Sequence, residues 1–215
     1  MQRSPRFFTV ILGVMLGSAV AAEEAARPSD DLRTDAAIRE LVRRGAVVKR
    51  FTVLESETGG LLVRLKAEHL DREGKIDSDV VAALRSLREL SLELRSLPLS
   101  DDGLKSLLAK LSLVGLDVSG SEISDRGLQE FKAAKSRLRL LDVSFTRVGD
   151  EGLKSLASLL ELRHLSLIGC QVTDSGTDSL TRLERLREIY LAKTQVSPQA
   201  AEKLRRRFPM CRVER

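Results

Sequence analysis

Aliphatic residues recur along the chain with a nearly constant period. Short segments in which two aliphatic residues flank one other residue begin at Leu116, Leu141, Leu165 and Ile189, at steps of 25, 24 and 24 residues. Each segment follows another Leu by three positions. Alternation of this kind is typical of a short strand with one buried face. The pattern therefore predicts one strand in each repeat.

A second aliphatic position, at Ile123, Val148, Val172 and Val196, predicts the start of a helix in each repeat. In most repeats the next residue supplies a side-chain oxygen that can cap the helix, and an Asp or Pro then suits the first helical position. The expected caps are Ser100, Ser124, Thr173 and Ser197. The predicted inward faces of the helices comprise Leu104, Leu107, Leu108, Leu128, Phe131, Leu153, Leu156, Leu160, Leu180 and Leu183.

The repeats extend upstream in a less regular form. The same unit begins at Leu87 with two extra residues in its turn, and Ile76–Val81 is the second half of a more degenerate copy. About five and a half repeats thus occupy residues 61–215. A unit of one strand and one helix cannot bury its own faces, so neighbouring repeats must stack. We therefore predict one α/β solenoid with parallel strands inside.

These spacings resemble the leucine-rich repeat family, in particular the cysteine-containing subtype with the unit LxxLxLxxCxxITDxGLxxLxx, found in F-box proteins and in bacterial exported repeat proteins. The resemblance covers about 150 of 215 residues, and residues 204–213 resemble the closing unit of the bacterial members. It implies a right-handed solenoid with strands on the concave face and helices on the convex face. It also implies a non-catalytic protein-interaction module. Nothing in the chain resembles an F-box, so no ubiquitin-ligase role is implied.

The N-terminal part departs from the repeat. Arg3 and Arg6 precede an apolar run over residues 7–20, and Ala19 and Ala21 match a cleavage site, which predicts a signal peptide over residues 1–21. An uncleaved anchor is the alternative. Residues 22–60 are interpreted as a linker and an N-terminal cap, with a helix over about 30–44 and strands around 47–53 and 61–66. The interpretation implies export to a periplasmic or extracellular location, with no stable membrane span after cleavage.

Composition narrows the classes of partner. The net charge of +5 falls to +3 once the signal peptide is removed, and only 3% of the residues are aromatic, with no Trp. Nucleic-acid and carbohydrate sites usually carry stacking aromatic rings, so neither partner is favoured. Two His and two Cys argue against a four-ligand zinc centre. We predict a monomer that uses no cofactor and no metal, and whose partner is a protein or peptide.

The outward positions of the strands form the predicted partner-binding surface. Adjacent strands lie about 4.8 Å apart, so Asp117 and Asp142 should be neighbours. Acidic side chains would favour a basic partner, and Tyr190 could serve as an aromatic anchor. The predicted contact residues are Glu89, Ser91, Asp117, Ser119, Asp142, Ser144, His164, Ser166, Glu188 and Tyr190. Two alternatives remain open: an acid/base or metal site built on Asp117, Asp142 and His164, and a merely solvated surface.

Three further features carry predictions. A basic run at Arg205, Arg206 and Arg207 could contact an anionic surface. This contact supports an alternative role as an envelope-associated structural protein that binds such a surface or self-associates. In the other interpretation, the three arginines are the solvated face of the last helix. Cys170 is expected to hydrogen-bond the turn backbone, and both it and Cys211 are expected to be free and buried. His69 is expected to be exposed in an irregular turn.

Overall fold

The computed structural model describes residues 32–51, 60–132 and 137–215. The predicted signal peptide lies outside these residues, as do residues 22–31 and 52–59 of the predicted linker and cap. Among the helices of the described residues, none is long and apolar enough to cross a membrane.

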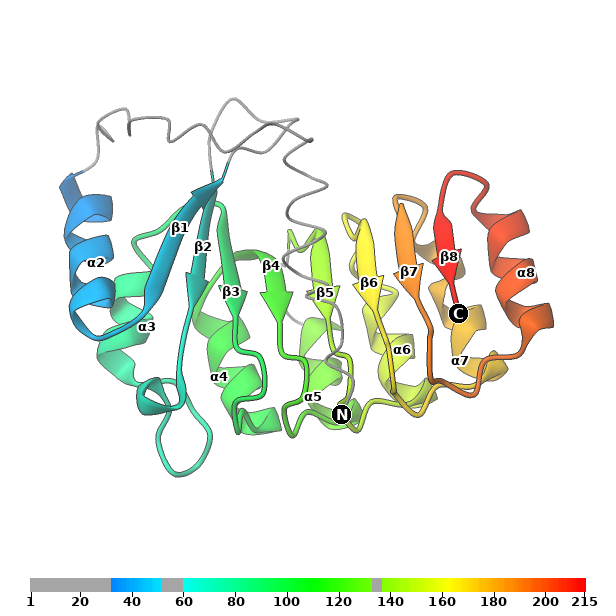
Figure 1. The fold of residues 1–215 in the computed structure, drawn as a ribbon, viewed down its shortest axis with the longest axis horizontal. Coiled ribbons are helices and arrows are strands. Elements are labelled where there is room, and N and C mark those ends of the chain that lie inside the picture. The colour runs from blue at the N-terminus through cyan, green and yellow to red at the C-terminus, as the bar shows by residue number, and fades with distance from the viewer. Residues whose placement is uncertain (1–31, 52–59, 133–136) are drawn as a thin grey trace.

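One eight-stranded sheet runs the length of the molecule, with its strands in chain order from β1 to β8 (Figure 1). All neighbours from β2 onward are parallel, whereas β1 (Val47–Phe51) is antiparallel to β2. The parallel strands are β2 (Gly60–Arg64), β3 (Leu90–Glu93), β4 (Leu113–Asp117), β5 (Leu140–Asp142), β6 (His164–Ser166), β7 (Glu188–Tyr190) and β8 (Arg212–Glu214). The predicted one strand per repeat is confirmed.

Helices alternate with these strands and lie behind the sheet in Figure 1. They are α3 (Ser78–Leu84), α4 (Asp101–Lys110), α5 (Asp125–Gln129), α6 (Asp150–Leu156), α7 (Asp174–Asp178) and α8 (Pro198–Arg207), with short 3₁₀ segments η2 (Glu130–Lys132) and η3 (Ser179–Arg182) after α5 and α7. This arrangement confirms the predicted α/β solenoid.

The core is a stack of aliphatic side chains contributed by equivalent positions of successive repeats. Leu116, Leu141, Leu165 and Ile189 are almost completely buried between the sheet and the helices. The prediction for Leu160 is wrong, because α6 ends at Leu156 and leaves this side chain 54% exposed in the following turn. No repeat could bury its strand and helix without the neighbour on either side.

The predicted helix caps are confirmed in four repeats. The side chains of Ser100, Ser124, Thr173 and Ser197 each accept a hydrogen bond from a backbone N–H in the first turn of the following helix. Gly149 occupies the corresponding position before α6 and has no side chain to offer. These bonds satisfy donors that a helix N-terminus leaves without partners.

The Asp residues at the helix starts connect each repeat to the next one. Asp101 accepts hydrogen bonds from the N–H and hydroxyl of Ser124 at 2.9 and 2.6 Å, and Asp150 accepts the same pair from Thr173 at 2.8 and 2.6 Å. Asp174 does so from Ser197, while Asp125 receives only the N–H of Gly149. We call these four carboxylates the aspartate ladder. It joins the helix starts of successive repeats.

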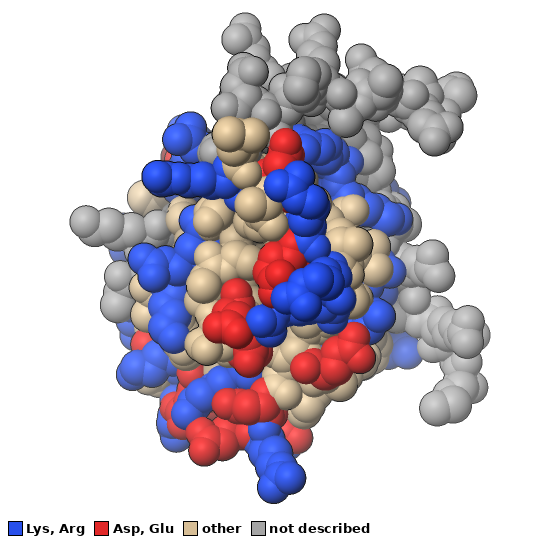
Figure 2. All heavy atoms as spheres, turned by 90° about the vertical axis from the view of Figure 1, so that its left-hand side faces the viewer, with Lys and Arg blue, Asp and Glu red and all other residues tan. Residues whose placement is uncertain are grey.

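An N-terminal cap covers the first end of the solenoid. It contains α2 (Leu32–Arg43), β1, and the 3₁₀ segment η1 (Ala67–His69), and α2 packs against α3. Figure 2 shows basic and acidic side chains intermingled on this end, in agreement with ion pairs such as Arg44–Glu40 and Arg50–Asp35. Such a polar outer face is what a terminal repeat needs in water. The prediction that His69 is exposed is wrong, because only 2% of this residue is accessible.

Both cysteines are free and buried, as predicted. The thiol of Cys170 donates to the backbone oxygen of Val143 at 3.1 Å, which confirms the predicted bond to the turn backbone. Burial raises the pKa of both thiols to about 11. Each therefore stays protonated at neutral pH and is a poor nucleophile.

Candidate functional site

The strand register aligns the outward side chains in rows that cross the sheet. Asp117 pairs with Asp142, which pairs with Ser166 and then Tyr190 on the next strands. A second row runs through Leu140, His164 and Glu188. We call these outward positions of β3 to β7, together with the residues that follow each strand, the strand face. The predicted proximity of Asp117 and Asp142 is confirmed.

Asp117 is held in a network of hydrogen bonds. Its Oδ1 accepts from the backbone N–H and hydroxyl of Ser119 at 2.9 and 2.6 Å, and its Oδ2 accepts from Arg95 at 2.9 Å. No part of Asp117 is accessible, and this burial raises its pKa against the opposing effect of Ser119 and Arg95. The carboxylate is therefore already neutralised by a cation of the same chain.

Asp142 has a different environment although it stands beside Asp117. Its Oδ1 accepts from the N–H of Ser144 at 2.9 Å, and no cation lies within ion-pair distance of it among the described residues. Burial, followed by the neighbouring charge of Asp117, raises the pKa of Asp142 to about 7. Asp142 is thus partly protonated at neutral pH. Two close carboxylates in a poorly hydrated environment resist simultaneous ionisation.

A second cluster lies two strands further along the sheet. Nδ1 of His164 lies 3.3 Å from Oε2 of Glu188, and the hydroxyl of Tyr190 donates to the same oxygen at 3.1 Å. The bond from His164 lowers the pKa of Glu188, and burial raises the pKa of Tyr190 to about 12. Between the two clusters, the hydroxyls of Ser144 and Ser166 lie 2.7 Å apart. These contacts fix the side chains before any partner binds.

The remaining predicted contact residues lie at the first repeat. Ser91 is buried, and Glu89 lies just before β3 with its Oε1 3.5 Å from Arg137. The surface is not the openly solvated one weighed from the sequence, since Asp142 is 2% exposed and Ser166 is fully buried. The general attraction of a basic partner is also weaker than expected, because Arg95 and Arg64 pair with Asp117 and Glu93.

Phe145 was missed as a candidate by sequence reasoning. It is 43% exposed, more than Tyr190, and follows Ser144, three residues after the end of β5. Its φ is +56°, and Ser96, Gly120, Gly169 and Lys193 adopt the same left-handed backbone at the equivalent place in other repeats. This conformation favours Gly, so an exposed Phe here is strained. The signal available in the sequence was a large aromatic residue where two other repeats have Gly.

The three arginines near the C-terminus have intramolecular partners. Arg205 donates to the backbone oxygen of Val213 and Arg207 to that of Thr181, at 3.0 and 3.1 Å. Arg206 is 81% exposed at its side chain and pairs only with Glu202 among the described residues. Two of these three side chains therefore hold α8 against its neighbours.

The fold and the strand face together define an α/β solenoid protein with one strand and one helix in each repeat. A family model for leucine-rich repeats matches residues 136–157, which supports a leucine-rich repeat family. The match covers one repeat, and the cysteine-containing subtype remains a prediction. Within the described residues, no group of three or more His, Cys, Asp or Glu is placed to hold a metal ion.

Comparison with solved structures finds leucine-rich-repeat proteins of low sequence identity. An internalin from Listeria monocytogenes is 18% identical over 65% of this chain and 38% of its own, with a TM-score of 0.42. The leucine-rich-repeat ectodomain of a receptor kinase from Arabidopsis thaliana is 17% identical over 77% and 95%, with a TM-score of 0.37. A leucine-rich-repeat protein of Leptospira interrogans is 14% identical over 66% and 58%, with a TM-score of 0.29. No curated protein matches the chain.

Proposed function

We propose that the protein is an exported, non-catalytic interaction module that binds a protein or peptide on its strand face. Leucine-rich-repeat proteins generally act in this way, and the observation that carries the proposal is the fixed row of side chains across β4 to β7. Their hydrogen bonds to one another lower the entropic cost of binding, because the surface is ordered in advance.

The exposed ring of Phe145 is the proposed anchor of this surface, together with the partly exposed Glu89, Glu188 and Tyr190 among the predicted contacts. Aromatic side chains carry a large share of the binding energy in protein interfaces. Lys193 lies over the ring at 5.6 Å and provides a charged neighbour. A partner that presents an apolar side chain next to a carboxylate would complement this pair.

A hydrolase built on Asp117, Asp142 and His164 has less support. Arg95 and Ser119 occupy the oxygens of Asp117, and His164 is oriented by Glu188 rather than by either Asp. The envelope role through residues 205–207 is also less well supported, because Arg205 and Arg207 are engaged with backbone oxygens. The geometry thus favours recognition by the strand face.

The test is capture of partners from the exported fraction of the host, with the full chain as bait and each captured protein then titrated in purified form. Phe145→Ala and Leu160→Ala form a matched pair, since each removes one half-exposed apolar side chain, the first on the strand face and the second beyond α6. We expect Phe145→Ala to weaken binding at least tenfold and Leu160→Ala to leave it unchanged. Binding lost with Arg206→Glu alone would support the envelope role instead.

A further inference from the structure

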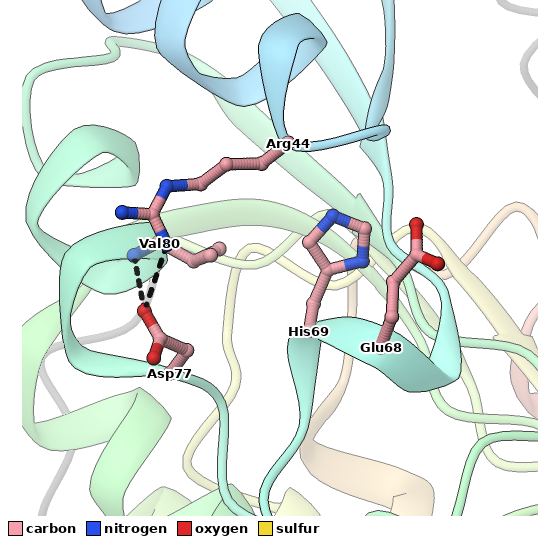
Figure 3. Close-up of a pocket in the computed structure, with 5 residues that line it drawn as sticks. All are labelled: Arg44, Glu68, His69, Asp77 and Val80. Atoms are coloured by element: carbon pink, nitrogen blue, oxygen red, sulfur yellow. Dashed lines mark hydrogen bonds and ion pairs between the residues drawn. The ribbon is translucent and has the colours of Figure 1, made fainter.

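A small pocket opens in the N-terminal cap, between the end of α2, η1 and α3. Its volume is about 300 Å³, and it is lined by Arg44, Glu68, His69, Asp77 and Val80 (Figure 3). None of these residues belongs to the strand face, so the pocket is independent of the proposed binding surface. A volume of this size suits a small metabolite rather than a protein segment.

His69 supplies a buried hydrogen-bond donor to this pocket. Nδ1 of His69 lies 2.9 Å from the backbone N of Lys66 and 3.1 Å from the backbone O of the same residue. That oxygen already accepts from the backbone N–H of His69 at 3.0 Å, whereas Nδ1 is the one acceptor of the Lys66 N–H among the described residues, so we assign Nδ1 as the acceptor. With Nδ1 as the acceptor, the ring proton is on Nε2. His69 is only 2% exposed, and its Nε2 is buried without a hydrogen-bond partner among the described residues. Buried polar groups in folded proteins almost always have a partner, so an acceptor is missing here.

Arg44 lies across the pocket from His69 and has spare donors (Figure 3). Its guanidinium donates to Glu40, Asp77 and Asp79 at 2.5, 3.4 and 2.8 Å. Three bonds use three of the five N–H groups of a guanidinium, which leaves two for another acceptor. The three carboxylates hold the guanidinium in a fixed orientation, so the spare donors are ordered in advance.

The same pocket also presents acceptors. Oε1 of Glu68 lies 3.7 Å from Nζ of Lys66, and its carboxylate accepts no hydrogen bond from the described residues. Oδ1 of Asp77 caps α3 by accepting from two backbone N–H groups, and its second oxygen is not used by the cap. Val80 adds an apolar surface. The lining thus combines donors, acceptors and one aliphatic wall.

This combination selects the charge of the ligand. A simple anion would satisfy His69 and Arg44 but would lie among the carboxylates of Glu68 and Asp77. A simple cation would satisfy those carboxylates but would leave Nε2 of His69 without an acceptor. We propose that the pocket binds a free α-amino acid, whose carboxylate accepts from His69 and Arg44 and whose ammonium donates to Glu68 or Asp77. Val80 restricts the ligand to a small aliphatic side chain.

The first test is a titration of the full chain with L-alanine, in which binding is monitored by NMR through the ¹⁵N and ¹H resonances of the His69 imidazole. We expect a saturable shift of these resonances, and binding at least tenfold weaker for acetate and for methylamine, each of which carries one of the two charged groups. Absence of a saturable shift would overturn the proposal and assign the pocket to water. If acetate binds as tightly as alanine, the proposed zwitterionic ligand is wrong and the pocket recognises a carboxylate alone.

Two substitutions at one position provide the matched control. In His69→Asn the amide oxygen can take the place of Nδ1 and keep the bond from Lys66, but no donor replaces Nε2. In His69→Gln the amide nitrogen can take the place of Nε2, while the bond from Lys66 is lost. We expect alanine binding to weaken about tenfold in His69→Asn and by less than threefold in His69→Gln. Unchanged binding in His69→Asn would refute the role of Nε2, whatever the outcome at the strand face.

Discussion

Aspartates recur at the repeat period in two regions of the molecule, and their chemistry is opposite in the two. In the aspartate ladder, the N–H and hydroxyl of Ser197 donate to Asp174 and lower its pKa. On the strand face, burial and the charge of Asp117 raise the pKa of Asp142 to about 7. The residue type and its spacing are therefore a poor guide to the role of an Asp. The burial of each carboxylate and the donors around it together determine the direction of its pKa shift.

The largest expected loss of stability comes from adding a methyl group next to a carboxylate of the aspartate ladder. A Cβ added at Gly152 would lie 2.5 Å from Oδ1 of Asp125, which is fixed by its bond from Gly149. We expect Gly152→Ala to lower the free energy of unfolding by about 3 kcal/mol, measured by urea denaturation. Gly149→Ala is the control, because its Cβ would meet no atom closer than 3.4 Å. Equal losses in the two substitutions would mean that the contact with Asp125 is not the cause of the loss in Gly152→Ala.

Removing one carboxylate of the ladder should have the next largest effect. Asp150→Ala deletes two acceptors and leaves the N–H and hydroxyl of Thr173 without their partner. We expect a loss of about 2 kcal/mol in the same measurement. Asp102→Ala is the control, since Asp102 is 60% exposed and pairs only with Arg126 among the described residues. A loss in the control as large as that of Asp150→Ala would show that the ladder bonds contribute nothing.

Asp142 should make stability fall as the pH rises. Its folded pKa of about 7 lies above the ordinary value of 3.8, so the folded state binds the proton more tightly. The resulting stabilisation is complete below about pH 4 and is lost as the pH rises through 7. In Asp142→Asn this dependence should disappear, and the variant should exceed the wild type at pH 8 by on the order of 1 kcal/mol. A variant less stable than the wild type at pH 8 would contradict the raised pKa.

Asp174 should have the opposite effect and make stability fall as the pH falls. Its pKa is lowered in the folded state, so its contribution is present above the ordinary pKa and is lost as the pH falls through the folded value. In Asp174→Asn the stability curve should therefore become flatter on the acid side only. The comparison of the two Asn variants over pH 2 to 9 separates the two regions within one protein.

The smallest expected effect is a gain in the free energy of unfolding. Gly149 is the one cap of the ladder without a hydroxyl, and its φ of −128° is open to any residue. In Gly149→Ser the new hydroxyl can donate to Oδ2 of Asp125 as Ser124 does to Asp101. We expect unfolding to cost about 0.5 kcal/mol more. If Gly149→Ser is no more stable than Gly149→Ala, the new hydroxyl does not form the bond to Asp125.

Periodicity was sufficient to predict the solenoid, its strands and its helix caps, because each is a local pattern repeated along the chain. It did not predict the bonds of the ladder, which join Asp150 to a residue 23 positions later and depend on how repeats stack. The pairing of Arg95 with Asp117 was missed for a similar reason, since Arg95 reaches across from the preceding repeat. His69 was expected to be exposed because it lies in an irregular turn, yet its ring folds back onto the backbone of Lys66.

The ladder also bears on how the length of such a protein can change. Each of the four ladder joints matches an Asp at the start of one helix with the N–H of the residue before the next helix, and three of the four joints add a hydroxyl. The two halves of each joint are thus interchangeable along the chain. Whole units of about 24 residues can be inserted or deleted with every joint still matched, whereas a shift by a few residues would leave one acceptor facing the wrong atoms.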